Sequence, residues 1–323
     1  MKRIAIFTSG GDAPGMNACI RAVVRTGLHH GLEVFGIYRG YQGMIEGDIV
    51  PLYSASVSNI IQRGGTILKS SRSAEFLTKE GRQKAMNALQ KYGIEGVVAM
   101  GGDGTFHGAS VFTSEHGVPF VGIPCTIDND LYGTDFTIGY DTAINTVVEA
   151  VDKIRDTATS HNRLFIVEVM GRDAGFIALR SGIASGADAI FVPETQTDMN
   201  YVAKQLQRSW ARERSSSILI VAEGDEFGGA MEVHAELQKR FPEKEMRISI
   251  LGHLQRGGNP SCMDRVLASR LGMAAVETLL EDKHTVMVGL RHRDITLTPF
   301  ESAVKHNLSL NPGLLKLAET MVI

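Results

Sequence analysis

The chain has 323 residues, of which 43% are hydrophobic, so it is long enough for one large or two medium-sized globular domains. Its 33 basic and 36 acidic residues give a formal net charge of −3, which argues against nucleic acid or anionic lipid as the main partner. Three widely separated cysteines match no disulfide framework or zinc pattern, and no stretch resembles a signal peptide or a membrane span, so we expect a cytoplasmic protein.

Short apolar stretches alternate with longer amphipathic stretches along the chain. The expected strands are Ile4–Phe7, Glu33–Ile37, Gly96–Met100, Phe120–Pro124, Arg163–Val169, Ala189–Val192, Ser217–Ala222, Arg247–Ile250 and Thr285–Leu290. The expected helices between them include Met16–His29, Gly81–Tyr92, Thr142–Thr159, Met199–Arg212 and Gly229–Arg240. This alternation predicts an α/β fold in which parallel sheets are covered by helices on both faces. Residues 1–139 and 140–252 read as two successive βα units, whereas the segment after Leu254 could pack on either.

The first strand leads into a glycine-rich turn, Gly10–Gly15, directly before the first helix. Glycines allow a tight turn and let a phosphate approach the backbone amides at a helix N-terminus. An ordinary strand-to-helix turn explains the same residues about equally well. The turn is not a Walker loop, because no Gly-Lys pair occurs in the chain, and it lacks the glycine spacing of a dinucleotide-binding fingerprint.

A second glycine turn, Gly101–Thr105, follows the apolar strand Gly96–Met100. Asp103 in this turn could hold Mg²⁺ directly or through water, while Gly104 leaves room for a nucleotide phosphate. The plainer interpretation is an aspartate that caps the next helix. Because both Gly-Gly-Asp turns lie at the carboxyl ends of strands, where ligands gather in open parallel sheets, we favour the ligand-binding interpretation.

The segment Thr126–Asp130 follows another apolar strand and contains two carboxylates and a hydroxyl group. On an extended backbone, alternation would place Thr126, Asp128 and Asp130 on one side. One carboxylate could then accept the proton of an attacking hydroxyl group. A solvated Asx-turn loop is the alternative, and it explains the polarity but not the apolar strand that leads into the segment. Together with the glycine turns, this segment predicts phosphoryl transfer to an alcohol.

Charged residues also follow three later strands. Arg172 follows one of them, where it could neutralise charge on a transferring phosphoryl group. His253 and Arg256 lie beside glycines after another strand, and their side chains suit a sugar phosphate. Glu223 follows a third strand and could bind sugar hydroxyls. Each of these residues taken alone is more often a surface or structural group.

Five segments in this order resemble the bacterial-type ATP-dependent 6-phosphofructokinase family. They are Gly10–Asn17, Gly101–Thr105, Pro124–Asp130, Ser160–Arg163 with Glu168–Arg172, and Leu251–Gly258. The resemblance implies two Rossmann-like three-layer αβα domains with mostly parallel sheets and an active site in the cleft between them. Residues 1–139 and 255–305 would form the larger, ATP-binding domain. Residues 140–254 and 306–323 would form the smaller, sugar-phosphate-binding domain.

The resemblance also implies a reaction. The γ-phosphoryl group of MgATP would pass to the 1-hydroxyl of fructose 6-phosphate, the committed step of glycolysis. Asp128 would be the general base, and Thr126 and Asp130 would orient the reacting groups. Arg172 would stabilise the phosphoryl group in flight, and Gly11 would belong to the same catalytic set. The ATP site would be lined by Gly11, Arg72, Ser73, Gly102, Asp103, Gly104 and Thr105, with Asp103 on Mg²⁺.

Further residues carried over from the resemblance bind the sugar phosphate and effectors. Fructose 6-phosphate would be bound by Thr126, Asp128, Met170, Gly171, Arg172, Glu223, His253 and Arg256. Arg163 and Arg247 would reach it from a neighbouring subunit, so the site would need an oligomer, in this family usually a homotetramer. An ADP and phosphoenolpyruvate effector site would use Arg21, Arg25, Arg155, Asp188, Arg212 and Arg214. Ser54, Asn59, Ser215 and Ser216 depart from the residues usual at that site. By helical spacing alone Arg21 and Arg25 share one face, which could be an anion site but by default is a solvated face.

Three departures from the family pattern bear on the nucleotide site. Cys125 stands where the family usually has glycine, whereas pyrophosphate-using relatives tend to carry lysine there and aspartate in place of Gly104. This chain has neither, which favours ATP over pyrophosphate. Lys69 and Ser73 replace a usual glycine and a usual aromatic residue, so we expect different packing around adenine.

Two other classes of protein remain as alternatives. The NAD kinase and diacylglycerol kinase group shares the Gly-Gly-Asp-Gly-Thr turn, but the run around Asp128 and the segment His253–Arg256 argue against it. A catalytically silent, ligand-sensing subunit is the other alternative, and the complete set of acids argues against that.

Overall fold

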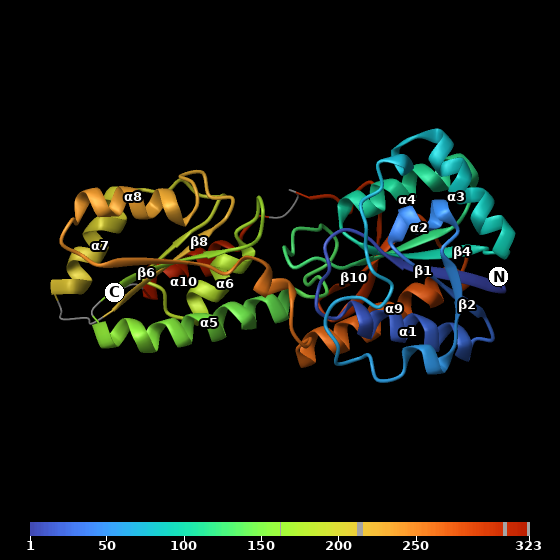
Figure 1. The fold of residues 1–323 in the computed structure, drawn as a ribbon, viewed down its shortest axis with the longest axis horizontal. Helices are drawn as coiled ribbons and strands as arrows, with labels where there is room; N and C mark the ends of the chain where they lie inside the picture. Colours follow the sequence, from blue (N-terminus) through green and yellow to red (C-terminus); the bar gives the residue numbers. More distant parts are fainter. Residues whose placement is uncertain (162, 212–215, 306–308, 322–323) are drawn as a thin grey trace. The chain divides into compact units, whose positions relative to one another are not determined.

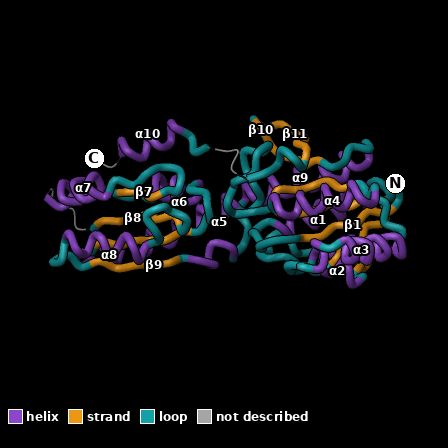
Figure 2. The backbone as a smooth tube through the Cα atoms, turned by 90° about the horizontal axis from the view of Figure 1, so that it is seen from above, coloured by secondary structure: helices purple, strands orange, loops and turns teal. Residues whose placement is uncertain are grey.

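The computed structural model describes residues 1–161, 163–211, 216–305 and 309–321 (Figure 1). The chain divides into two compact units: Met1–Thr142 with Arg256–Leu308, and Ala143–Gln255 with Ser309–Ile323. Each unit contains one sheet flanked by helices, which Figure 2 shows in a second view. The predicted α/β class with mostly parallel sheets is confirmed. Within the described part of the chain, no helix is both long enough and apolar enough to span a membrane.

The first unit is built on a seven-stranded sheet in the order β11-β10-β5-β4-β1-β2-β3. Its strands are β1 (Arg3–Thr8), β2 (Glu33–Ile37), β3 (Ile49–Leu52), β4 (Gly96–Gly101), β5 (Phe120–Pro124), β10 (Val286–Arg291) and β11 (Asp294–Pro299). Its helices are α1 (Met16–His29), α2 (Gly40–Glu46), α3 (Lys79–Tyr92), α4 (Asp103–His116) and α9 (Cys262–Leu280). The edge strands β3 and β11 run antiparallel to their neighbours, and the strands between them run parallel. Figure 1 shows α1 and α9 on one face of this sheet and α2, α3 and α4 on the other.

The core of the first unit fixes the ends of its central strands. Every residue of β4 is buried, as is typical of a parallel strand covered by helices on both faces. On the α4 face, the ring of Phe120 lies 6.4 Å from that of Phe7 and 5.7 Å from that of Phe112, in edge-to-face arrangements. Such aromatic pairs contribute about 0.5–1.5 kcal/mol each beyond the burial of their area. This packing therefore holds β1, β5 and α4 in register beneath the segments that follow the strands.

The second unit is built on a four-stranded, wholly parallel sheet in the order β7-β8-β6-β9. Its strands are β6 (Leu164–Val169), β7 (Ala189–Phe191), β8 (Ser217–Ala222) and β9 (Met246–Ile250). Its helices are α5 (Tyr140–His161), whose first turn still belongs to the first unit, α6 (Phe176–Ala184), α7 (Met199–Ala211), α8 (Ala230–Arg240) and α10 (Pro312–Met321). All six residues of β8 are buried, so β8 forms the centre of the core of this unit.

The bounds of several elements agree with the sequence-based expectation residue by residue. Strands β2, β5 and β8 and helix α1 begin and end where the apolar pattern predicts. Strands β3 and β11 escape prediction from the sequence. β3 has only four residues, one of them Pro51, and β11 is largely exposed, so neither shows the apolar run of a buried strand.

Candidate active site

Three polar segments meet at one edge of the first sheet. Strands β1, β4 and β5 are neighbours and run parallel, so the segments after them start side by side. The amide of Ser9 donates to the carbonyl of Met100 at 2.9 Å, and the amide of Cys125 donates to the carbonyl of Gly101 at 3.0 Å. The structure therefore brings together both glycine turns and the acidic segment Thr126–Asp130.

The second glycine turn combines one crowded glycine with two open ones. A Cβ atom on Gly101 would collide with the Thr105 side chain, whereas one on Gly102 or Gly104 would meet no atom within 4 Å. Asp103 is the first residue of α4, and its Oδ1 accepts a hydrogen bond from the Gly104 amide at 2.7 Å. The N-cap residue Gly102 has no side chain to cap α4, and of the first amides of the helix that of Gly104 is bonded to Asp103.

The first glycine turn is shaped around an arginine. A Cβ atom on Gly11 would collide with the Arg256 guanidinium group, which donates from Nη1 to the Asp12 carbonyl at 3.1 Å. Gly10 and Gly15 have φ values of 83° and 110°, in the region that favours glycine. Arg256, predicted to bind sugar phosphate, thus lies against Gly11, predicted to line the ATP site.

The segment that carries Arg72 is tied to the same turn. The Ser70 hydroxyl donates to the Gly10 carbonyl at 2.6 Å, and the Thr8 hydroxyl donates to the Lys69 carbonyl at 2.7 Å. Arg72 is exposed. The Ser73 hydroxyl donates to Gln42 Oε1 at 2.8 Å and accepts from the Phe76 amide at 3.2 Å, so it stabilises the local turn.

The acidic segment is bent rather than extended, which corrects the sequence-based expectation that Thr126, Asp128 and Asp130 alternate onto one side. Asn129 has a φ of 53°, and its side chain accepts from the Thr137 amide at 2.7 Å. A left-handed residue breaks the two-residue period of a strand, so strand alternation does not place these side chains. Asparagine tolerates this conformation better than most residues.

The two carboxylates of this segment have different surroundings. Asp128 is 3% exposed, and its amide donates to Thr126 Oγ1 at 3.2 Å. Asp130 is also buried, and its Oδ2 lies 3.2 Å from Lys305 Nζ. The ion pair with Lys305 holds Asp130 in place. Lys305 was not expected from the sequence, because it lies far along the chain beside no motif.

A buried network anchors the acidic segment from behind. The Thr137 hydroxyl donates to the Thr126 carbonyl at 2.6 Å. The amides of Gly139 and Thr142 each donate to one oxygen of Asp264 at 2.8 Å, and the Thr142 hydroxyl donates to the same carboxylate at 2.5 Å. Asp264 is fully buried in α9, and this burial raises the pKa of its carboxyl group. Sequence reasoning missed Asp264, and its only sequence mark is the Ser261 cap three residues earlier.

In the second unit, the loop after β6 is held by Glu223, which directly follows β8, and by Gln255 in the 3₁₀ helix Gly252–Arg256. Glu223 Oε1 accepts from the Arg172 amide at 2.8 Å and from the Gly171 amide at 3.3 Å. Gln255, which is fully buried, accepts from the Met170 amide at 3.3 Å. Arg172 has a φ of 52°, so the hydrogen bonds that the two amides donate to Glu223 hold a left-handed backbone in place. The structure thus brings Met170, Gly171, Arg172 and Glu223 together.

Two other predicted sugar-phosphate residues, Arg163 and Arg247, are not brought to this loop. Arg163 precedes β6, and its Nε lies 3.0 Å from Glu245 Oε2; Arg247, near the start of β9, also pairs with Glu245. These pairs hold the pKa of Glu245 below its ordinary value. Both arginines lie at the amino ends of strands. The seven residue steps from Arg163 to Met170 span roughly 23 Å, so Arg163 lies at the opposite end of β6 from the loop. His253 is exposed in the short 3₁₀ helix Gly252–Arg256, whose Gln255 accepts the hydrogen bond from the Met170 amide of the loop.

The expected effector residues are only partly described. Arg21 and Arg25 lie on α1 in the first unit, where burial and the neighbouring Arg25 lower the pKa of Arg21. In the second unit, Arg155 donates to the carbonyls of Ser185 and Gly186, and buried Asp188 accepts from the Ile218 amide at 2.9 Å. Arg212, Arg214 and Ser215 lie outside the described residues.

The carboxylate of Asp103 suits a magnesium ion carried by a nucleotide. Among the described residues, no group of three His, Cys, Asp or Glu side chains could form a metal-binding cage. Mg²⁺ commonly needs none, since it binds through one or two carboxylates plus substrate phosphates and keeps several waters. Asp103, beside the open glycines of the second turn, fits that role.

Comparisons with known proteins agree with one another. The sequence profile of the phosphofructokinase family matches residues 3–279. The ATP-dependent 6-phosphofructokinase 1 of Thermus thermophilus is 57% identical over 323 residues, which cover 100% of both chains. The ATP-dependent 6-phosphofructokinase of Cytophaga hutchinsonii is 54% identical over 321 residues, which cover 99% of this chain and 98% of that relative.

Solved structures give the same fold. Phosphofructokinase from Saccharomyces cerevisiae aligns with a TM-score of 0.91 at 36% identity over 100% of this chain, which spans 48% of the yeast chain. A pyrophosphate-dependent phosphofructokinase from Marinobacter aquaeolei aligns with a TM-score of 0.84 over 100% of this chain and 92% of its own. At 20% identity, that second likeness bears on the fold alone.

Proposed function

The chain belongs to the phosphofructokinase family, and from this premise we propose that it transfers the γ-phosphoryl group of MgATP to the 1-hydroxyl of fructose 6-phosphate. The products are fructose 1,6-bisphosphate and ADP. The enzyme is therefore a phosphotransferase of glycolysis with an alcohol acceptor. Full-length likeness to proteins named ATP-dependent 6-phosphofructokinase supports this reaction.

The observation that carries the proposal is the meeting of three segments at the carboxyl ends of β1, β4 and β5. The acidic segment and the second glycine turn follow the adjacent strands β5 and β4, and the hydrogen bond from Cys125 to Gly101 holds them together where they begin. Phosphoryl transfer requires mainly that donor and acceptor be aligned and that charge be neutralised. The open glycines Gly102 and Gly104 beside the buried Asp128 support both requirements in one place.

Each residue then has a role in binding or proton transfer. Asp128 takes the proton from the 1-hydroxyl of the sugar phosphate, and Thr126 and Asp130 orient the reacting groups. Asp130 is held in place by its ion pair with Lys305. Arg172 neutralises charge on the transferring group, and its backbone is held for this purpose by Glu223. Met170, Gly171, Glu223, His253 and Arg256 bind the sugar phosphate.

The nucleotide binds over the open glycines. Gly102 and Gly104 leave space for phosphates, while Gly11, Arg72, Ser73 and Thr105 line the remainder of the site. Asp103 holds Mg²⁺, which neutralises charge that develops on the phosphates. The first unit would thus be the ATP-binding domain and the second the sugar-phosphate-binding domain.

ATP rather than pyrophosphate is the donor in this proposal. Relatives that use pyrophosphate tend to carry aspartate in place of Gly104, and that carboxylate would occupy the space that is open above this turn. A negative charge there would also repel a nucleotide phosphate. The names of the full-length relatives point the same way.

Assembly, regulation and location complete the proposal. A homotetramer would let Arg163 and Arg247 serve the site of a neighbouring subunit. Both arginines lie at the amino ends of their strands, away from the loop after β6 in their own subunit, and this position supports the proposal. ADP and phosphoenolpyruvate would bind through the effector residues named above. The enzyme would work in the cytoplasm, where free thiols such as Cys19, Cys125 and Cys262 stay reduced.

A donor comparison tests the reaction. Formation of fructose 1,6-bisphosphate is measured with Mg²⁺ and fructose 6-phosphate at saturating ATP or pyrophosphate. The proposal expects turnover with ATP and at least about 100-fold less with pyrophosphate. Equal turnover with both donors, or turnover with pyrophosphate alone, contradicts the choice of donor, and no turnover with either contradicts the reaction.

A further inference from the structure

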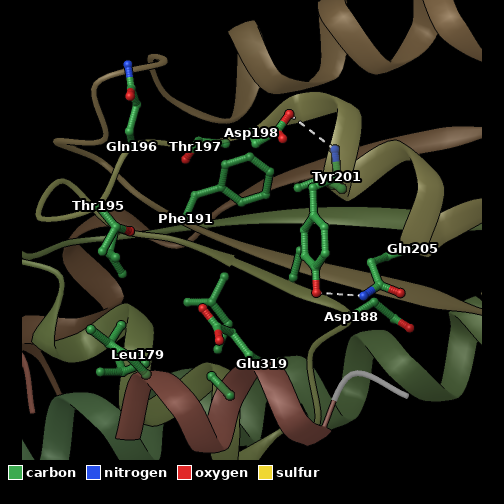
Figure 3. Close-up of a pocket in the computed structure, with 16 residues that line it drawn as sticks. Leu179, Asp188, Phe191, Thr195, Gln196, Thr197, Asp198, Tyr201, Gln205 and Glu319 are labelled. Carbon is green, nitrogen blue, oxygen red and sulfur yellow. Dashed lines mark hydrogen bonds between the residues drawn. The ribbon is translucent and has the colours of Figure 1, made fainter. Parts of the chain in front are cut away.

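The second unit contains a cavity of about 230 Å³ that no part of the proposed reaction uses (Figure 3). Its walls come from β7 and the loop after it, from α6 and α7, and from the C-terminal helix α10. The lining residues that matter here are Phe191, Tyr201, Gln205, Leu315, Ala318 and Glu319. At about 30 Å³ per small group, the cavity takes a molecule of roughly eight non-hydrogen atoms.

The cavity offers aromatic and apolar surface to such a molecule. Figure 3 shows the Phe191 ring and the Tyr201 ring on its walls, with Glu319 projecting from α10. Phe191 is buried, while the side chain of Tyr201 is 50% exposed and is held by a hydrogen bond of 2.8 Å from Gln205 to its hydroxyl. A flat ring would find the exposed Tyr201 ring as an aromatic partner, while the buried Phe191 closes the wall behind it.

The charges that line the cavity are all negative. Asp188, Asp198 and Glu319 line it, and no lysine, arginine or histidine does so among the described residues. Asp188 accepts a hydrogen bond from the Ile218 amide, and Asp198 caps α7 through bonds from the amides of residues 200 and 201. Glu319 makes no hydrogen bond or ion pair with another described residue. An anion would therefore be repelled, whereas a cation would gain a carboxylate partner at the rim.

Helix α10 covers the cavity without being buried itself. None of its described residues is buried, although Leu315 and Ala318 face the cavity and its sequence is rich in leucine. An isolated helix of this length is only marginally stable in water, so α10 depends on its packing. A ligand beneath it would remove more of the apolar area of Leu315 and Ala318 from water, and would thereby stabilise the docked helix.

We propose that this cavity binds a small organic cation: a primary amine on a compact aromatic body. The ring lies against Tyr201, beneath Leu315, and the ammonium group pairs with Glu319. Attraction between the cation and the ring faces adds to the ion pair. The wall chemistry distinguishes this ligand from phosphorylated effectors, which need basic residues.

Three probes with the same ring and different charge test the proposal. Phenethylamine, 2-phenylethanol and 3-phenylpropionate are titrated calorimetrically into the full chain at neutral pH. We expect saturable 1:1 binding of phenethylamine at least about tenfold tighter than that of 3-phenylpropionate, with the alcohol between them. Glu319→Gln should weaken phenethylamine at least about fivefold and leave the alcohol unchanged. Equal binding of the amine and the carboxylate, or no saturable amine binding at concentrations on the order of 10 mM, overturns the proposal.

A matched pair of variants locates the binding. Ala318→Trp fills the cavity from α10, whereas Thr320→Trp places the same side chain on an exposed position of the same helix. We expect the first variant to lose amine binding and the second to keep it. Unchanged amine binding by Ala318→Trp, with circular dichroism confirming that it is folded, places the amine elsewhere and overturns the proposal. Loss of binding by Thr320→Trp as well overturns the assignment to the inner face of α10.

Discussion

The backbone amide of Cys125 donates a hydrogen bond of 3.0 Å to the carbonyl oxygen of Gly101. This bond joins Gly101, the last residue of β4, to the first residue after β5. The segment proposed to bind the nucleotide and the segment proposed to activate the sugar hydroxyl are therefore held together by their backbones. The Cys125 side chain is buried, and burial raises the pKa of its thiol well above the ordinary value. Cys125 is thus a packing residue here, and its backbone rather than its sulfur serves the site.

Replacing Gly104 separates the needs of the fold from those of the ligand. A Cβ atom at position 104 meets nothing within 4 Å, so Gly104→Ala should change the melting temperature by no more than about 2 °C. If a phosphate lies over this glycine, the same variant should raise the KM for ATP by about tenfold or more, because the methyl group occupies the ligand's space.

Gly101→Ala is the control for that variant. Its Cβ atom would collide with the Thr105 side chain and lie 2.9 Å from the Ser9 carbonyl, so we expect a loss of about 1–3 kcal/mol in stability. Thermal unfolding and initial-rate kinetics measure the two effects. An unchanged KM for ATP in Gly104→Ala would place the nucleotide elsewhere.

The Thr142 hydroxyl should matter more than its methyl group. It donates to Asp264 at 2.5 Å and accepts from the Ser261 amide at 2.9 Å. Thr142→Val removes one hydrogen bond from the buried Asp264 carboxylate, which keeps those from the amides of Gly139 and Thr142. It also leaves the half-buried Ser261 amide without its acceptor, and we expect a cost of about 1–3 kcal/mol in the free energy of unfolding. Thr142→Ser keeps the hydroxyl and should cost about 1 kcal/mol or less. Urea denaturation measures both, and equal losses in the two variants would mean that the network contributes little.

The ion pair between Arg82 and Glu115 should stabilise the fold at neutral pH and lose its effect in acid. Arg82 donates to both oxygens of Glu115, at 2.5 Å and 2.7 Å, and these bonds lower the pKa of Glu115 from its ordinary value of 4.5. A carboxyl group with a lower pKa in the folded state stabilises that state above the unfolded pKa, and this contribution disappears as the pH falls through the folded pKa. Glu115→Gln should therefore lower the melting temperature at pH 7, with a deficit that shrinks below about pH 4.5.

An exposed ion pair provides the control for pH. Lys84 and Glu75 lie 2.7 Å apart, but their side chains are 62% and 39% exposed, so Glu75→Gln should have little effect at any pH. Melting curves of the three proteins between pH 3 and pH 7 make the comparison. A deficit of Glu115→Gln that is the same at every pH would assign the loss to packing instead of charge.

Mixed oligomers test whether active sites are shared between subunits. Asp128→Ser should inactivate the subunit that carries it, and the double variant Arg163→Ala with Arg247→Ala should weaken binding of sugar phosphate at the neighbouring site. When the two inactive proteins are unfolded and refolded together, some sites regain Asp128 from one subunit and both arginines from the other. We expect activity to reappear only in the mixture. No recovery in demonstrably mixed oligomers would confine the arginines to their own subunit.

The sequence predicted the parts of the site that follow apolar strands. The stretches Gly96–Met100 and Phe120–Pro124 are apolar throughout, and the polar residues after each could be placed at a strand end from the sequence alone. The parallel order of these strands then brought the two segments together. Local pattern was sufficient here because the fold repeats one βα unit.

Other features depend on contacts between distant parts of the chain, which a local pattern does not contain. The left-handed Asn129 bends the acidic segment because Thr137 supplies its hydrogen bond, so the predicted strand alternation was wrong there. Lys305 pairs with Asp130 across 175 positions, and Asp264 is buried although it reads as a polar residue near a helix N-terminus. Glu223 holds the backbone of Arg172, a role that residue type alone does not reveal.

The most direct test is the turnover of Asp128→Ser with saturating MgATP and fructose 6-phosphate, beside Asp152→Ser on the exposed face of α5. We expect kcat to fall by ~10²–10⁴ in Asp128→Ser, while the dissociation constants of both substrates stay within roughly threefold of their starting values. Asp152→Ser should retain full turnover. Normal turnover by a folded Asp128→Ser would show that another group takes the proton, and the proposed active site would then be wrong.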